Sequence, residues 1–313
     1  MPDFIVRRLL GTLPVLAVVT ILVFLMLRLI PGDPAAIIAG DNATSDQIEL
    51  IRGKLGLNEA LWAQFGIWLG HLAQGNLGES FFFKTTVAEL IGQRIEPTLA
   101  LSLCTLLIAT VIAVPTGVLA AYRQGSYFDR IVMALSVIGF SVPGFVVGYC
   151  LIYVFSISLS LLPVQGYVRL HEDAVGCILH LILPSLTLSV GFIALISRMT
   201  RAAVIEVLKE DYIRTARAKG LSEQTVLVRH ALRNAAVPVL TIIGTSVAVL
   251  IGGVVVTETV FGLPGLGRLT VEAVLSRDFP TIQAVILMFS VVYVLINLLI
   301  DILYTICDPR IRL

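Results

Sequence analysis

Residues 199–234 hold the densest group of basic side chains in the chain, in a polar stretch between two long apolar runs. With the arginine just before it, the stretch contains eight of the 22 Lys and Arg residues: Arg198, Arg201, Lys209, Arg214, Arg217, Lys219, Arg229 and Arg233. We predict that this stretch docks a partner rather than performing catalysis. We therefore assign no catalytic residue to the chain and predict that it is not an enzyme.

The pattern of the stretch predicts two helices joined by a tight turn. Residues 201–219 are strong helix formers with few breakers, and apolar or small residues recur along them at a helical spacing: Val204, Leu208, Tyr212 and Ala216. Gly220 stands where a helix ends in the left-handed conformation, with apolar Leu221 behind it. Ser222 can cap the second helix, and Glu223 places a negative charge at its positive end.

Composition determines the class of protein that carries this hairpin. The chain is 57% hydrophobic and only 14% charged, and its mean hydropathy is +0.95, whereas a globular domain averages about 25% charged residues. Its apolar runs are long enough to cross roughly 30 Å of hydrocarbon. We predict an all-α polytopic membrane protein. The net charge of +1 gives no indication of a nucleic-acid partner.

Six membrane spans are predicted. The first, Leu9–Ile30, is too long for a cleavable signal peptide and lacks a small-residue cleavage site, so we interpret it as a signal anchor. The others are residues 98–121, 131–157, 178–198, 235–257 and 282–306. The predicted division is thus 1–30 (N-terminus and first span), 31–97 (extracytoplasmic helical segment), 98–306 (five-helix core containing the 199–234 loop) and 307–313 (tail).

The long first loop contains three patches compatible with helices, at about 44–56, 59–73 and 86–95. The middle patch lines up apolar side chains on one face, with both tryptophans of the chain in this patch: Leu61, Trp62, Phe65, Trp68 and Leu72. Two interpretations remain for it. It lies on the bilayer surface, where such aromatics are favoured, or it packs on the core of a small helical cap.

Lys and Arg residues predict the orientation. With a cytoplasmic N-terminus, fourteen of the 22 fall on the inner side, and four of the remaining eight lie in the long first loop, where the positive-inside rule is weak. Both termini and the 199–234 loop are therefore predicted to be cytoplasmic. A DNA-reading helix-turn-helix is disfavoured because both ends of the loop are tied to spans, so we predict no nucleic-acid partner.

The spans lack the groups that drive an independent carrier. The second, third and fifth contain no Asp, Glu, Lys, Arg or His; the fourth has His180 near its outer end and Arg198 at its inner boundary, and the sixth has only Asp301. Ion-coupled carriers commonly place acidic or basic residues near the membrane midplane, so the near absence of such residues makes a self-sufficient carrier the less favoured alternative. No G-x-x-x-x-G-K-[ST] loop occurs either. If ATP drives this protein, another chain binds it.

Two further sets of polar residues have alternative interpretations. An outer group contains metal-ligand types, but its spacing fits no compact motif, and we assign no metal site: His171, Glu172, Asp173, Cys177 and His180. Uncharged polar residues within the spans either line a passage or bond backbone carbonyls: Ser136, Ser141, Thr187, Ser189, Thr245 and Ser246.

Residues 211–221 (DYIRTARAKGL), continuing to 229–235 (RHALRNA), resemble a loop of a known family. It is the cytoplasmic coupling loop of permease subunits of ATP-binding-cassette (ABC) importers, in the dipeptide, oligopeptide and nickel group. The general pattern of that loop is E-A-A, three residues, Gly, nine residues and I-x-L-P. Ala216 and Gly220 match it, whereas four positions depart from it: Arg214, Thr215, His230 and Arg233. Three other segments also resemble this group: 30–34 (IPGDP), 75–80 (GNLGES) and 258–268 (ETVFGLPGLGR).

The resemblance implies a type I ABC importer permease with six transmembrane helices in a bacterial inner membrane. Its implied partners are a second homologous permease forming a heterodimer, two ATPases that bind ATP and Mg, and an extracytoplasmic solute-binding protein, while this chain holds no cofactor. The implied solute is a di- or oligopeptide; nickel, glutathione, and an oligosaccharide or opine are the alternatives. The coupling residues would be Asp211, Thr215, Ala216, Gly220, Leu221, Ser222, Glu223 and His230.

Overall fold

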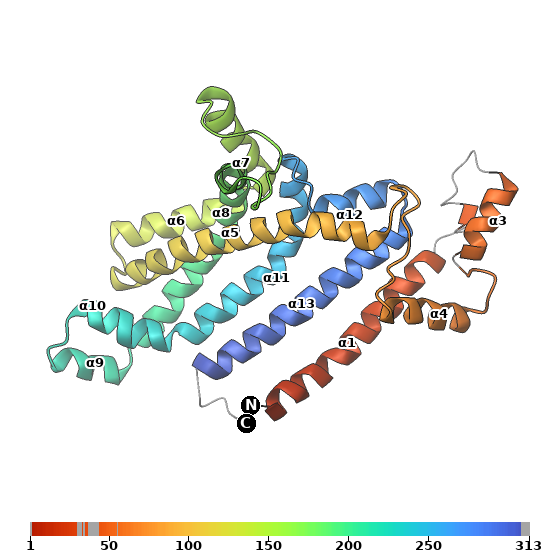
Figure 1. Ribbon diagram of the computed structural model, residues 1–313. Helices are drawn as coiled ribbons and strands as arrows, with labels where there is room; N and C mark the ends of the chain where they lie inside the picture. Colours follow the sequence, from red (N-terminus) through yellow and green to blue (C-terminus); the bar gives the residue numbers. More distant parts are fainter. Residues whose placement is uncertain (1, 30–32, 34, 37–43, 55, 308–313) are drawn as a thin grey trace. The chain divides into compact units, whose positions relative to one another are not determined.

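The computed structural model describes residues 2–29, 33, 35–36, 44–54 and 56–307, and in these residues every regular element is a helix (Figure 1). The elements are α1 (Pro2–Arg28), α3 (Ser45–Lys54), α4 (Leu61–Ala73), α5 (Val87–Tyr122), α6 (Tyr127–Ser141), α7 (Gly144–Leu151), the π-helix η1 (Ile152–Ser158), α8 (Ala174–Leu208), α9 (Asp211–Ala218), α10 (Glu223–Thr225), the π-helix η2 (Val226–Leu232), α11 (Ala236–Val260), α12 (Leu266–Leu275) and α13 (Phe279–Cys307). Among the described residues, five helices are long and apolar enough to cross a membrane, and the number rises to six if the bent pair Tyr127–Ser141 and Gly144–Ser158 is one span. The prediction of an all-α polytopic membrane protein is confirmed.

The chain forms two compact units. One comprises residues 1–96 and 265–295, and the other comprises residues 97–264 and 296–313. Helices α5 and α13 contribute residues to both. We call them the first-loop unit and the hairpin unit, after the long first loop and the 199–234 hairpin that they contain.

The third predicted span is broken in the structure. Helix α6 ends at Ser141, and the segment Gly144–Ser158 then leaves at an angle of 101°. Proline explains the break: Val142, which precedes Pro143, is extended at φ −82° and ψ 126°, because the Pro ring disfavours the helical conformation of the residue before it. The uninterrupted run 131–157 is therefore two helical pieces, the second of which ends as π-helix η1.

Helix α5 joins two elements that the sequence predicts separately, the patch 86–95 and the span 98–121. It runs for 36 residues through Pro97 and Pro115. Proline in a helix interior removes one backbone hydrogen bond, but membrane helices tolerate it because neighbouring groups satisfy the freed carbonyl. The composition change at Pro97 marks where the helix becomes apolar, not where it begins.

In the first-loop unit, α4 packs on α1 through aromatic side chains. Phe65 and Trp68 lie with their ring centroids 5.0 and 5.6 Å from that of Phe24. Leu61 and Trp62 remain exposed, at 57% and 81%. Helix α4 thus has a packed face, as the interpretation of a helical cap requires, and an exposed aromatic end; its position on the bilayer surface stays a prediction.

Of the segment 30–34, only Asp33 is among the described residues; Ile30, Pro31, Gly32 and Pro34 lie outside them, as does the tail beyond residue 307. The Asp33 carboxylate accepts a hydrogen bond from Arg52 Nη2 at 2.6 Å. This contact holds the pKa of Asp33 below its usual range. It ties Asp33 to α3.

The resemblance segment 75–80 is anchored by a buried cluster. Ser80 Oγ donates to Asp278 Oδ2 at 2.5 Å, and Thr281 Oγ1 donates to the same oxygen at 2.7 Å. Ser80 Oγ also accepts from the backbone N–H of Phe83. All three hydroxyl and carboxyl side chains are buried, so one carboxylate joins the loop to the first turn of α13.

Replacing Asp278 with alanine is expected to destabilise the first-loop unit by about 2 to 4 kcal/mol, because two buried hydroxyl donors lose their acceptor. Thermal unfolding in detergent and limited proteolysis within residues 76–86 measure the effect. Asp278→Asn, which keeps an acceptor oxygen, is the matched control and should lose less. An Asp278→Ala protein as stable as Asp278→Asn would contradict this account.

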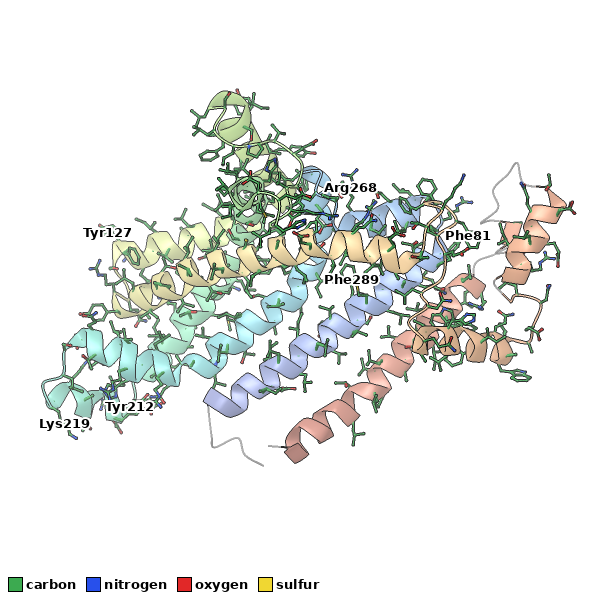
Figure 2. The ribbon with its side chains drawn as sticks, viewed as in Figure 1. Phe81, Tyr127, Tyr212, Lys219, Arg268 and Phe289 are labelled. Carbon is green, nitrogen blue, oxygen red and sulfur yellow. The ribbon has the colours of Figure 1, made fainter. Side chains whose placement is uncertain are left out.

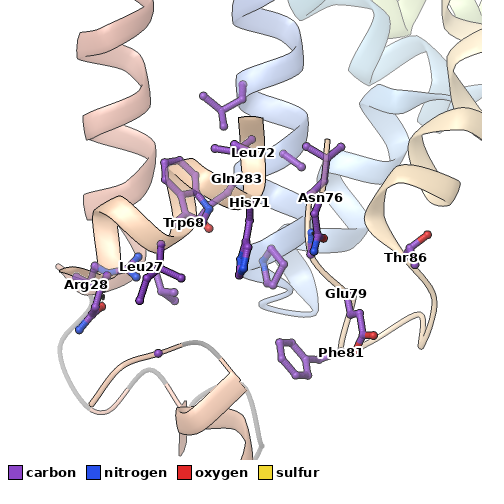
Figure 3. Close-up of a pocket in the computed structure, with 18 of the residues that line it drawn as sticks. Leu27, Arg28, Trp68, His71, Leu72, Asn76, Glu79, Phe81, Thr86 and Gln283 are labelled. Atoms are coloured by element: carbon purple, nitrogen blue, oxygen red, sulfur yellow. Dashed lines mark hydrogen bonds between the residues drawn. The ribbon is translucent and has the colours of Figure 1, made fainter. Parts of the chain in front are cut away.

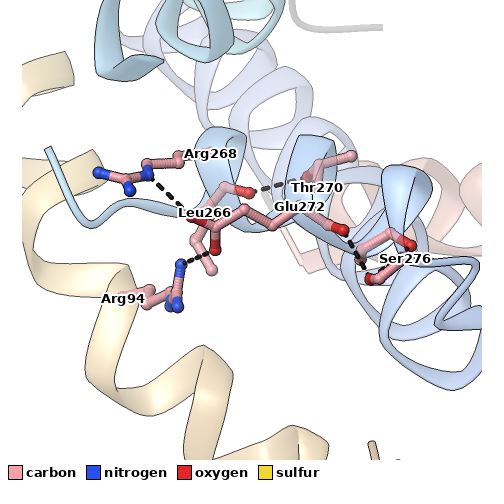
Figure 4. Close-up of polar contacts among 7 residues, drawn as sticks. Arg94, Leu266, Arg268, Thr270, Glu272 and Ser276 are labelled. Atoms are coloured by element: carbon pink, nitrogen blue, oxygen red, sulfur yellow. Dashed lines mark hydrogen bonds and ion pairs between the residues drawn. The ribbon is translucent and has the colours of Figure 1, made fainter. Parts of the chain in front are cut away.

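Helix α12 is held to the beginning of α5 by a single carboxylate, that of Glu272 (Figure 4). Arg94 Nη1 and Arg268 Nε each lie 2.8 Å from one of its two oxygens. Two guanidinium groups therefore share one carboxylate on the predicted extracytoplasmic side of the first-loop unit.

Candidate functional site

The predicted docking hairpin begins with a break that the sequence pattern does not show. Helix α8 ends at Leu208, Glu210 is extended at ψ 146°, and α9 begins at Asp211. The single helix predicted over 201–219 is therefore wrong. No Gly or Pro lies here, so tertiary packing overrides propensity. The break lets Val207 and Leu208 pack against the cluster inside the hairpin.

The turn of the hairpin is a Schellman motif. Leu221 N–H bonds the carbonyl of Ala216 at 3.4 Å, and Gly220 N–H bonds that of Arg217 at 2.9 Å. Gly220 has φ 79°, which confirms the predicted left-handed helix end. A Cβ on Gly220 would meet nothing within 4 Å, so backbone conformation, and not space, requires glycine.

The second helix of the hairpin is capped as predicted but wound differently. Ser222 Oγ accepts the Thr225 N–H at 3.4 Å, and the Glu223 carboxylate binds Arg217 Nε at 2.8 Å and Nη2 at 3.2 Å. Residues 226–232 then form π-helix η2, a form frequently found at functional sites. The Arg217–Glu223 pair clamps the two arms of the hairpin across the turn.

The hairpin has a buried inner face and an exposed outer face. Ile213, Ala216 and Val226 are 0%, 6% and 0% exposed and form one apolar cluster. Of the eight predicted coupling residues, Ala216 is buried, Glu223 and His230 are partly buried, and five are exposed: Asp211, Thr215, Gly220, Leu221 and Ser222. The outer face is thus available to a partner.

Figure 2 labels two exposed side chains of the hairpin, Tyr212 and Lys219. Tyr212 is 41% exposed, and its partial burial raises the pKa of its phenol. Val228 is 60% exposed. Apolar and basic groups are therefore mixed on a surface that the sequence predicts to be cytoplasmic.

A buried ion pair anchors the root of the hairpin. Arg201 of α8 binds Asp129 of α6 through Nε at 2.5 Å and Nη2 at 2.7 Å, and Asp129 also accepts the Gly125 N–H. The side chain of Asp129 is 5% exposed and that of Arg201 is 23% exposed. The pair fixes the beginning of α6 to the part of α8 that leads into α9.

Close helix contact reinforces this anchor. A Cβ on Gly117 of α5 would lie 2.6 Å from the Ser197 carbonyl oxygen and 2.8 Å from Thr200 Cβ on α8. Ala203, Ala231 and Ala235 belong to one small-residue cluster in the same unit. Small residues allow helices to approach closely in membranes, so α5, α8 and the hairpin form one packed assembly.

A second buried carboxylate lies at the other end of the hairpin unit. Glu258, near the end of α11, is 0% exposed, and its Oε1 accepts from Thr98 Oγ1 at 2.5 Å. The predicted spans end or begin one or two residues short of Glu258 and Asp129, so the apolar-run analysis overlooks both. The signal that could have found Glu258 is its place at the head of the resemblance segment 258–268.

The six uncharged polar residues within the spans all bond backbone carbonyls. Each hydroxyl lies within hydrogen-bonding distance of a carbonyl three or four residues earlier, at 2.6 to 3.1 Å: Ser136, Ser141, Thr187, Ser189, Thr245 and Ser246. Ser136 Oγ also lies 3.1 Å from Ser197 Oγ, which links α6 to α8. The backbone-bonding interpretation accounts for these hydroxyl groups without a passage.

The outer group of residues 171–180 with metal-ligand side chains does not form one cluster, and its members make separate structural contacts. Asp173 accepts the Val175 N–H and caps α8, and His180 Nδ1 bonds the Gly176 carbonyl at 2.8 Å. Cys177 is buried beside the Tyr167 hydroxyl. Across the described part of the chain, no three His, Cys, Asp or Glu residues lie together as a metal site would require.

The hairpin unit combines apolar helices of membrane-spanning length with an exposed, capped hairpin. Family comparison identifies the chain: residues 113–313 match the model described as binding-protein-dependent transport system inner membrane component, and residues 1–102 match its N-terminal companion. The chain belongs to this family. It is a multi-pass inner-membrane transport subunit of the ABC importer class.

Relatives cover the chain from end to end. It is 53% identical over 309 residues, 99% of each chain, to a probable peptide ABC transporter permease protein, y4tP, of Sinorhizobium fredii. It is 45% identical over 312 residues, 100% of this chain and 99% of the relative, to the glutathione transport system permease protein GsiC of Escherichia coli. These matches confirm the resemblance to the peptide group of permeases.

A solved structure shares the fold. The inward-facing MetNI methionine ABC transporter matches with a TM-score of 0.58 and 19% identity, over 70% of this chain and 96% of that chain. The likeness concerns the fold, and it confirms the predicted type I importer architecture.

Proposed function

We propose that this chain is one of two homologous permease subunits in an ATP-driven importer of peptide-like solutes. The rigid docking hairpin formed by α9, α10 and η2 carries the proposal. Its turn is fixed by a Schellman motif and by the Arg217–Glu223 clamp, and its outer face is exposed. A rigid element of this kind can transmit the closure of a partner to the spans.

The proposed energy path begins outside this chain. Two ATPase subunits bind ATP and Mg, and each docks a hairpin in a surface groove; this chain supplies one hairpin and its homologue the other. Arg201 and Asp129 connect the hairpin root to α6, and only three residues separate the π-helix η2 from α11. Movement of the hairpin is thereby passed to α6, α8 and α11 together.

The proposed solute is a di- or oligopeptide delivered by an extracytoplasmic binding protein. Support comes from relatives of full length whose names specify peptide or glutathione transport. Glutathione is itself a tripeptide derivative, so both names indicate the same chemical class. Nickel, an oligosaccharide or an opine are the alternatives.

Purification of the tagged chain in mild detergent tests the assembly. The expected result is a complex containing a second homologous permease and ATPase chains in stoichiometric amounts. Purification together with the binding protein, followed by mass spectrometry of the retained solute, should detect a peptide. A chain that transports solute alone, or a retained metal or sugar, would contradict the assembly or the substrate class respectively.

Ala216→Asp tests the interior of the hairpin. We expect at least a tenfold loss of ATPase retention and of transport, because an unpaired carboxylate would enter the cluster of Ile213 and Val226. Ala218→Asp is the matched control, since Ala218 is exposed on the same helix; it should retain most activity. Equal retention of the ATPases by both variants would contradict a docking role for a packed hairpin.

A further inference from the structure

The first-loop unit contains a cavity of about 770 Å³ that the coupling mechanism does not use (Figure 3). Its walls are one face of α4, the end of α1, the first turns of α13 and the loop of residues 76–81. This size lies within the range of small-molecule sites. The long first loop is predicted to be extracytoplasmic, so the cavity faces the side from which an imported solute arrives.

The lining of the cavity has an apolar part, which we call the floor, and a polar part, which we call the rim. The floor consists of aliphatic side chains from α1, α4, the loop and α13: Leu27, Leu72, Leu77, Ala284 and Leu287. On α4, Gln64, Trp68 and His71 lie at positions i, i+4 and i+7, which places them on one helix face toward the cavity. Phe81 adds a second aromatic ring to the lining (Figure 3).

Arg28 is held in place at the rim by its neighbours. Its Nε donates to Gln64 Oε1 at 3.0 Å, its Nη1 donates to the Phe24 carbonyl at 3.0 Å, and its Cζ lies 3.6 Å from the Phe24 ring centroid. Gln64 is 6% exposed and donates in turn to the carbonyls of Leu57 and Glu59. Among the described residues Nη2 makes no bond, which leaves one edge of a fixed guanidinium for an anion.

The rim carries both signs of charge. Arg28 contributes a cation and His71 an imidazole, and Glu59 and Glu79 contribute carboxylates to the same lining. Asn76 adds a side-chain amide whose oxygen accepts the Gly78 N–H. A ligand that satisfies this rim above an apolar floor has a carboxylate, an ammonium group and an apolar side chain.

We propose that this cavity binds a short peptide with free termini, its C-terminal carboxylate on Arg28 and an apolar side chain on the floor. The proposal rests on the proposed peptide transport. It adds a receiving site on the permease itself, distinct from the site of the binding protein. Arginine suits this role because its planar fork pairs with carboxylates.

The test measures equilibrium binding of radiolabelled alanyl-phenylalanine and of its C-terminal amide to the full complex in nanodiscs, without the binding protein. The wild type should bind the free acid at least tenfold more tightly than the amide. Arg28→Gln should lose about tenfold or more in affinity for the acid and bind acid and amide alike, while Arg28→Lys should retain part of the preference. A tenfold change in affinity is the effect expected for the loss of one charge-assisted hydrogen bond.

Arg52→Gln is the matched control, because Arg52 lies in the same long loop but outside the lining of the cavity. It should keep the preference for the acid. Co-purification of the ATPases with Arg28→Gln checks that the variant folds. Equal binding of acid and amide by the wild type, an unchanged preference in Arg28→Gln, or displacement of the peptide by anionic phospholipid would overturn the proposal. Failure of the wild-type complex to import any peptide would instead overturn the proposed function.

Discussion

Gly220→Val is expected to reduce transport to below a tenth of the wild-type rate while membrane insertion is unchanged. Gly220 adopts φ 79° at the turn of the docking hairpin. A β-branched residue there costs of order 1–3 kcal/mol in backbone strain and shifts the turn away from the Schellman geometry. Transport by reconstituted complex, substrate-stimulated ATP hydrolysis and ATPase retention measure the effect; all three should fall together.

The chain provides a matched control at the end of α4. Gly75 has φ 76°, no neighbour within 4 Å of a Cβ, and a Schellman bond from Asn76 N–H to the His71 carbonyl at 2.9 Å. Gly75→Val therefore imposes the same strain in the first-loop unit, which does not contain the docking hairpin. It should lower stability comparably and leave ATPase retention intact. Normal coupling in Gly220→Val, or equal loss of the ATPases in both variants, would contradict the assignment.

The docking hairpin contains one feature that could be predicted from the sequence, its turn, and one that could not, the break between α8 and α9. Gly220, Ser222 and Glu223 determine their turn through local backbone conformation and capping, so a short window of sequence is sufficient. The break between α8 and α9 depends on Val207 and Leu208 meeting a cluster that includes Val226. No local signal at residues 209–210 reports that contact, so the pattern predicts one continuous helix.

The third span illustrates a partial prediction. Pro143 is visible in the sequence and marks where the helix is interrupted. The bend of 101° and the π winding of η1 depend on how the following helix packs. That packing is close, since a Cβ on Gly148 would lie 3.3 Å from side-chain atoms of Phe261 and Thr187. Proline thus determines the position of the break but not its angle.

Ionisable groups at span ends are the least predictable part of the site. Asp129 and Arg201 are 72 residues apart in the sequence, and each looks like an ordinary boundary charge that sets orientation. Only the packing of α6 on α8 makes them a buried pair. The same holds for Glu258 and Thr98. Apolar runs find the spans, but they do not show which polar residues at the ends of different spans will meet.

Asp129→Ala is expected to destabilise the hairpin unit by about 3 kcal/mol. Removing one partner of a buried ion pair leaves the other charge uncompensated, which costs about 3 to 5 kcal/mol; we expect the low end because the Arg201 side chain is 23% exposed. The change in stability is measured by heating the complex in detergent and recording the fraction that remains monodisperse. Glu49→Ala, which breaks an ion pair with a carboxylate side chain 59% exposed, should change stability by less than about 0.5 kcal/mol.

The double variant Asp129→Leu with Arg201→Met separates stability from coupling. Apolar residues of similar volume can replace a buried pair with little loss of stability, so this protein should fold and assemble. If the pair transmits hairpin movement to α6, the double variant should hydrolyse ATP with weakened dependence on substrate and transport several-fold more slowly. Full stability with full transport would show that the pair only holds α6 against α8, and that movement of the hairpin reaches the spans through α8 and α11 alone.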